Sequence, residues 1–98
     1  MGRKLKEYLM NFYNRNYYEK FINSLSSGSK SAYRGVLGRF LEELGEQDVV
    51  MITPADVLKY TSSKTERAYI RSLLIYIAKN NINDGLNKIS KQLLVWLI

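Results

Sequence analysis

The sequence predicts an all-α protein, and three observations carry this prediction. Apolar residues recur along most of the chain at the three- and four-residue spacing of amphipathic helices. The 98 residues include one proline and six glycines, which are too few turn-forming residues for many short strands joined by tight turns. Capping signals separate the apolar stripes, while no linker, internal repeat or low-complexity segment divides the chain. We therefore expect a single domain over residues 1–98, with five helices or six.

The number of helices depends on residues 5–25, which carry two successive apolar stripes. Asn16, with Glu19 three residues later, has the pattern of a capping box and could restart the helix between the stripes. Two helices and one long helix both remain open. The pattern then breaks at Gly28, and Ser29 is expected to cap the next helix.

Two further boundaries are marked by familiar signals. The helix after Ser29 is expected to end at Gly45, in the left-handed conformation of a C-terminal cap. The apolar stretch 48–52 is too short to anchor a sheet. The segment Thr53–Asp56 is the clearest start signal, with a capping hydroxyl, a proline at the first position and an early acid for the helix dipole. The helix that it opens should end near Thr61.

The strongest predicted helix begins at a second capping box, formed by Ser63 and Glu66, and ends at Asn80 and Asn81. Asp84 could cap a last helix, so that residues 84–98 form a C-terminal helix with an apolar side. In the strongest helix, the residues expected to face the core are Tyr69, Ile70, Leu73, Leu74 and Ile77. In the last helix, the residues expected on one side are Leu86, Ile89, Leu93 and Trp96.

Composition excludes several function classes. The chain has no cysteine and no histidine, so it lacks disulfides, thiolate zinc sites, the commonest general base and the commonest metal ligand. It also has no glycine-rich phosphate loop and no metal-ligand spacing. We expect no catalytic residue, no cofactor, no metal and no small-molecule substrate. With no apolar run near the roughly 18 residues that cross a bilayer, and no signal peptide, we expect no membrane partner and a cytoplasmic, nucleoid-associated location.

Charge points to a polyanionic partner, because the net charge is +6 and its distribution is uneven. Residues 1–41 hold eight basic and two acidic side chains, and residues 57–83 hold five basic and one acidic. Residues 42–56 hold five acidic side chains and no basic one. An acidic pole and basic faces favour nucleic acid over an acidic membrane as the partner.

Two groups of side chains are candidates for DNA contact. In the first group, two basic residues four apart are expected on the outer face of their helix, opposite Leu37. In the second, three basic residues at i, i+3 and i+7 are expected away from the apolar side of theirs. Each group includes a hydroxyl near a predicted helix N-terminus, where phosphate oxygens bind well. Alternatively, each group is only the solvated face of an amphipathic helix. The candidates are Ser29, Lys30 and Arg34, and Lys64, Thr65, Arg67 and Arg71.

The aromatic residues are better explained by packing than by chemistry. Most of the eight tyrosines fall on apolar stripes, so we expect them in the core rather than stacked on bases. Trp96, within the apolar tail 93–98, either fills the core or belongs to a terminal helix that docks on a partner.

The order of three segments resembles a known family. Ser29 and Tyr33 open a helix that continues with Leu, Phe and Leu; residues 52–60 follow as a short helix, and residues 64–77 as a long one. This order resembles the N-terminal, SAM-like core-binding domain of tyrosine recombinases, the phage integrase family. The resemblance covers roughly residues 17–83. It departs from the family after the long helix, where Asn-Pro is common and this chain has Asn83-Asp84-Gly85.

The resemblance implies a SAM-like orthogonal bundle of four to five helices that forms one half of a clamp around double-stranded DNA. In that family, a separate domain cuts the strand, and its arginines, histidine and tyrosine have no counterpart here. The implied function is DNA binding in recombination or integration, as the non-catalytic half of an integrase or as a stand-alone relative. Implied partners are duplex DNA, a recombinase catalytic domain or a second copy, and the implied contacts are the seven candidate residues.

Two other functions remain open. One is a protein–protein interaction module that docks through the C-terminal apolar helix. The other is a helix-turn-helix regulator, in which residues 64–79 form the recognition helix.

Overall fold

The computed structural model describes residues 11–61, 63–81, 88–89 and 91–97. Across these residues the chain forms helices and no strand, which confirms the predicted all-α class. The elements are α2 (Phe12–Ser24), α3 (Ser27–Leu44), the 3-10 turn η1 (Val49–Met51), α4 (Pro54–Tyr60), α5 (Lys64–Asn80) and α7 (Lys91–Leu97).

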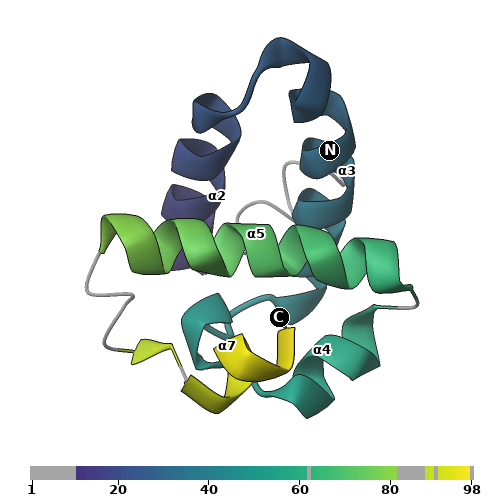
Figure 1. Ribbon diagram of the computed structural model, residues 1–98, viewed down its shortest axis with the longest axis vertical. Helices are drawn as coiled ribbons and strands as arrows, with labels where there is room; N and C mark the ends of the chain where they lie inside the picture. Colours follow the sequence, from purple (N-terminus) through teal and green to yellow (C-terminus); the bar gives the residue numbers. More distant parts are fainter. Residues whose placement is uncertain (1–10, 62, 82–87, 90, 98) are drawn as a thin grey trace.

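The helices form a bundle around α5. In Figure 1, α2 and α3 run antiparallel as a pair, and α5 crosses in front of both at a steep angle. The shorter helices α4 and α7 lie on the other side of α5 from the free end of this pair. One side of α5 packs against α2, α3 and α7, so this helix is the centre of the fold.

The first described helix is continuous through Asn16, so of the two alternatives left open there, a restart at this residue does not occur. The cap is Asn11 instead, whose Oδ1 accepts hydrogen bonds from the backbone N–H groups of Tyr13 and Asn14, at 2.7 and 3.2 Å. Because α2 begins at Phe12, Asn16 lies inside the helix and cannot serve as its N-terminal cap. The earlier stripe that begins at residue 5 lies largely outside the described residues.

The start of α3 also differs from the prediction. The cap residue is Ser26 rather than Ser29, and the backbone N–H of Ser29 already donates to the Ser26 carbonyl at 3.0 Å. Gly28 therefore lies inside the first turn, where its helical conformation costs propensity but meets no clash. At the other end, Gly45 ends α3 with φ 61° as predicted, although its ψ of −117° is not the left-handed helical value.

The remaining boundaries follow the predicted signals. Thr53 and Asp56 form a reciprocal capping box at the start of α4, which ends before Thr61. Ser63 accepts a hydrogen bond from the Glu66 backbone N–H at the start of α5. At its end, Asn81 adopts the left-handed conformation, with φ 49° and ψ 44°.

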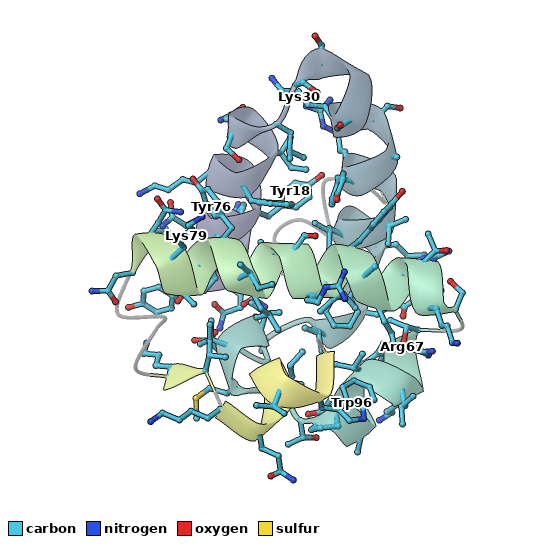
Figure 2. All side chains as sticks on the ribbon, viewed as in Figure 1. Tyr18, Lys30, Arg67, Tyr76, Lys79 and Trp96 are labelled. Atoms are coloured by element: carbon cyan, nitrogen blue, oxygen red, sulfur yellow. The ribbon has the colours of Figure 1, made fainter. Side chains whose placement is uncertain are left out.

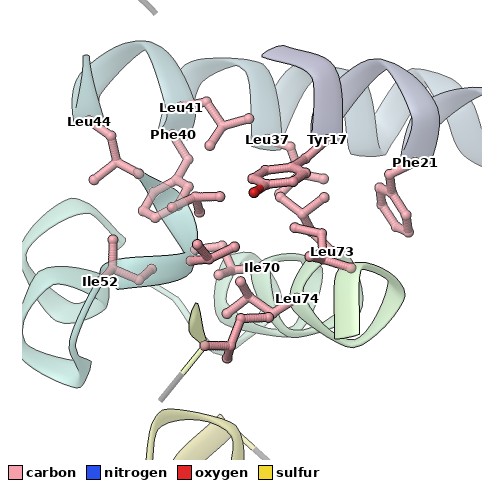
Figure 3. Close-up of a cluster of buried hydrophobic side chains, with 14 of the residues drawn as sticks. Tyr17, Phe21, Leu37, Phe40, Leu41, Leu44, Ile52, Ile70, Leu73 and Leu74 are labelled. Carbon is pink, nitrogen blue, oxygen red and sulfur yellow. The ribbon is translucent and has the colours of Figure 1, made fainter. Parts of the chain in front are cut away.

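The core lies where α2, α3, α5 and α7 meet, and Figure 3 shows part of it. Leu93 is fully buried and Ile89 nearly so, as predicted for the last helix. Trp96 is 41% exposed, so of the two alternatives for this ring, filling of the core does not describe its position. The predicted cap Asp84 lies outside the described residues. The largest fully buried side chains are Tyr17, Leu37, Leu41, Ile52, Ile70, Leu73, Leu74, Ile77 and Leu93.

A pair of asparagines ties the start of α2 to the loop that follows α3. The side chain of Asn14 is fully buried; its Nδ2 donates to the Gln47 carbonyl at 2.7 Å, and its Oδ1 accepts from the Val49 N–H at 2.7 Å. Asn11 adds two bonds to the same loop, from its backbone N–H to Gly45 and from Nδ2 to Glu46. Because these groups satisfy one another, a polar side chain is tolerated in the core.

Candidate nucleic-acid interface

The first candidate group does not lie on a single outer face of α3. Lys30 is half-buried, whereas Arg34 is exposed. The prediction that Lys30 lies opposite Leu37 is wrong, because seven residues are almost two full helical turns and place both on the same side. Lys30 is only partly buried because it lies one turn from the start of α3, at the tip of the α2–α3 pair (Figure 2).

The second group is divided between two sides of α5. Lys64 and Thr65 are exposed in the first turn, whereas Arg67 and Arg71 are half-buried. In Figure 2, Arg67 lies on the side of α5 nearer α4, away from the tip that carries Lys30. Thr65 lies on the opposite side of α5 from Arg67. It comes one helical turn before Tyr69, which contacts α3, and residues four apart share one side of a helix. The structure therefore brings the Thr65 side of α5, and not the Arg67 side, to the α3 contact.

A row of aromatic rings forms this contact. Tyr33 of α3 stacks on Tyr69 of α5, with centroids 4.3 Å apart and planes inclined by 21°. Phe21 of α2 makes a T-shaped contact with Tyr33 and a tilted contact with Tyr76, with ring centroids 5.5 and 5.3 Å apart. The three tyrosines are half-buried, so the prediction of core packing holds only for one part of each ring.

An ion pair that sequence reasoning missed also joins the two helices. Arg39 of α3 contacts the carboxylate of Glu66, whose side chain is only 12% exposed. Sequence reasoning assigned Glu66 to a capping box, and no local pattern pairs it with a residue 27 positions earlier. Arg39 therefore neutralises the negative charge of Glu66 at the start of α5. The positive charges of the neighbouring basic side chains are not offset by this carboxylate.

The other basic candidates are not neutralised in this way. Within the described residues, Lys30, Arg34, Lys64 and Arg67 have no acidic partner. Two acidic side chains cap helices instead. Asp48 accepts from the Val50 N–H to cap η1, and the Asp56 carboxylate completes the cap of α4. The backbone hydrogen bond from Thr53 lowers the pKa of Asp56, so it is ionised at neutral pH.

A glycine in α3 has a packing reason that composition did not reveal. A Cβ at Gly38 would lie 3.4 Å from the Tyr18 hydroxyl, which donates to the Arg34 carbonyl at 3.2 Å. Tyr18 lies between α2 and α3 in Figure 2, so this close approach belongs to the helix pair and not to a ligand. A Cβ at Gly35 would meet nothing within 4 Å, and nothing in the described structure requires a glycine there.

Among the described residues, no helix is long and apolar enough to cross a membrane. The same part of the chain holds no cluster of three or more acidic side chains that could bind a metal ion. Comparison of the sequence with protein-family models and curated proteins, and of the fold with solved structures, finds no match.

Proposed function

We propose that this domain binds double-stranded DNA through the N-terminal half of α3 and the first turns of α5. The observation that carries the proposal is the order of charges along α3. Lys30 and Arg34 lie toward its N-terminus, and Glu42 and Glu43 lie in its last turn. A helix dipole favours the reverse order, by about 0.3–1 kcal/mol for each charge in a terminal turn. The stability of α3 therefore does not explain this arrangement, whereas attraction of a polyanion does.

The N-terminus of α3 adds hydrogen-bond donors to the positive charge. No side chain caps this end, because Ser26 makes no capping hydrogen bond to the first turn. The surroundings of Gly28, in that turn, leave open space around its missing side chain. Uncapped amides at the positive end of a helix, next to Lys30, suit a phosphate group. Thr65 and Lys64 offer a hydroxyl and a charge at the start of α5.

Matched charge-removal variants test the proposal. Lys30→Ala/Arg34→Ala removes two charges from the N-terminal half of α3. Lys64→Ala/Arg67→Ala removes two from the first turn of α5, and because Arg67 lies on the side nearer α4, this pair also tests how far around α5 the interface extends. Lys79→Ala/Lys91→Ala removes two exposed charges from the last turn of α5 and the start of α7, away from the first turns of α3 and α5. The binding of a fluorescent duplex is measured by anisotropy at several salt concentrations.

We expect each interface pair to weaken binding at least about tenfold and to reduce the magnitude of the salt slope by about two, since each cation that neutralises a phosphate contributes about one unit. The control pair should change affinity less than about threefold, through the long-range field alone. Equal losses from all three pairs would mean diffuse electrostatic adhesion, and would contradict an interface built on α3 and α5.

A narrower proposal is that the domain is the core-binding half of a tyrosine recombinase or a stand-alone relative. Its support is the resemblance of the segments that form α3, α4 and α5. The chain lacks the histidine of the family's catalytic domain. Purified protein should therefore bind supercoiled DNA without nicking or relaxing it, with or without divalent metal. A covalent adduct between DNA and one of the tyrosines would contradict this proposal.

A second candidate function is docking to another protein through α7. The observation that favours it is the exposure of Val95 and Trp96, at 73% and 41%, on a helix that buries Leu93. Sedimentation velocity over a range of concentrations tests self-association, and Trp96→Ser should abolish any dimer that forms through this face.

A further inference from the structure

The tyrosines where α2, α3 and α5 meet differ in what their hydroxyl groups do. The Tyr18 hydroxyl donates to the Arg34 carbonyl at 3.2 Å, and the Tyr76 hydroxyl donates to the Lys20 carbonyl at 3.4 Å. The hydroxyl groups of Tyr33 and Tyr69 have no partner among the described residues. Neither hydroxyl oxygen is among the buried side-chain atoms that lack a hydrogen-bond partner, so both oxygens reach solvent. Two polar ends are thus presented to water at the α3–α5 contact.

The neighbours of these two tyrosines are the candidate residues of both helices. Tyr33 comes three residues after Lys30 and four after Ser29, and these spacings place all three on one side of α3. Tyr69 comes four residues after Thr65, on the side of α5 that contacts α3. Both rings therefore lie about one helical turn beyond candidate residues at the starts of α3 and α5.

The stacking geometry decides which part of each ring a ligand could contact. Tyr33 and Tyr69 cover one face of each other, and Phe21 packs against Tyr33 in a T-shaped arrangement. Intercalation of a base between the two rings would break their stack, and with it a contact that joins α3 to α5. The accessible polar feature is the hydroxyl edge, and hydroxyl donors of this kind contact phosphate oxygens in protein–DNA complexes.

We propose that the hydroxyl groups of Tyr33 and Tyr69 donate hydrogen bonds to phosphate oxygens of duplex DNA, between the contacts made by the first turns of α3 and α5. This inference rests on the proposed DNA-binding function and adds two neutral contacts to it. Because the stack holds both rings, little side-chain freedom is lost when the phosphates bind. The two hydroxyls set the position of the backbone on the protein, while the charges supply most of the attraction.

Removal of the hydroxyl oxygens alone tests this role. Tyr33→Phe, Tyr69→Phe and the double variant keep the stacked rings, and Tyr13→Phe is the matched control. Tyr13 also packs its ring against an aromatic residue, Phe12, but it lies at the start of α2, at the opposite end of that helix from the tip that carries Lys30. Anisotropy titrations with the same duplex at several salt concentrations give the affinity and the salt slope, and a thermal melt checks the fold.

We expect each single variant to bind about fivefold more weakly and the double variant about twentyfold, as for the loss of hydrogen bonds to a charged acceptor. The salt slope should not change, because a neutral hydroxyl releases no counterion. The control should bind like the wild type. Wild-type affinity in the double variant, beside a clear loss in Lys30→Ala/Arg34→Ala, overturns this proposal and leaves DNA binding intact. A changed salt slope in the Phe variants also overturns it, since the hydroxyls would then act through charged neighbours. Failure of the wild-type protein to bind duplex at low salt removes both proposals.

Discussion

Tyr33 stacks on Tyr69 at a centroid distance of 4.3 Å, and this contact joins the two helices that carry the candidate DNA-binding residues. The ion pair between Arg39 and Glu66 joins the same helices nearer the start of α5. With two contacts of different kinds, α3 cannot turn about its axis relative to α5 without breaking one of them. The N-terminal turns of the two helices are therefore held in one relative orientation.

The stack should be measurable as a coupling energy. A double-mutant cycle of Tyr33→Ala and Tyr69→Ala, followed by urea denaturation, separates the pairwise contact from the area that each ring buries alone. We expect a coupling of about 0.5–1.5 kcal/mol, the range found for aromatic pairs. Additive losses would show that the rings are adjacent without stabilising each other.

The buried asparagine should be far more sensitive than an exposed one. Asn14→Ala leaves the Val49 N–H and the Gln47 carbonyl without their partners in or near the core, and should lower the free energy of unfolding by about 2–4 kcal/mol. Asn23→Ala, on the exposed side of the same helix, should change it by less than about 0.5 kcal/mol. Chemical denaturation of both variants makes the comparison, and a similar small effect in both would contradict the clamp.

Acid should weaken the cap of α4 through Asp56. Its pKa is lower in the folded protein than its ordinary value of 3.8, first because of the backbone hydrogen bond from Thr53. A lowered carboxyl pKa contributes stability that is fully present above pH 4 and is lost as the pH falls through the folded-state value. Asp56→Asn should remove this part of the acid dependence. Thermal melts between pH 2 and pH 7 test this, and parallel curves for the variant and the wild type would contradict it.

The two sides of α7 should respond differently to truncation. Leu93→Ala removes a fully buried side chain and should lower the free energy of unfolding by about 2–5 kcal/mol. Trp96→Ala removes a ring that is 41% exposed, so its cost should be clearly smaller. Urea denaturation measures both, and a larger loss from Trp96→Ala would show that this ring belongs to the core.

The sequence predicted those features that depend on neighbours in the chain. Thr53 and Asp56 are three residues apart, and Gly45 and Asn81 follow the last apolar residue of a stripe, so their roles could be deduced before the fold was known. At the start of α3 the local pattern favoured Ser29, and this prediction was wrong by one turn. The helix begins three residues earlier, with Ser26 at the cap position.

The features of the candidate site depend on how helices pack, and they could not be deduced in the same way. Arg39 pairs with Glu66, and Tyr33 stacks on Tyr69, across 27 and 36 residues of sequence. The error at Lys30 was different in kind, since helical geometry alone places it on the side of Leu37.

The most direct test of DNA binding is the salt dependence of wild-type affinity for a random-sequence duplex. If about five phosphates are neutralised, the logarithm of the association constant should fall linearly with the logarithm of salt concentration, with a slope of about −4 to −5. Circular dichroism at each salt concentration confirms that the protein stays folded. A flat dependence, or no binding at the lowest salt concentration, would contradict the proposal that α3 and α5 form a DNA interface.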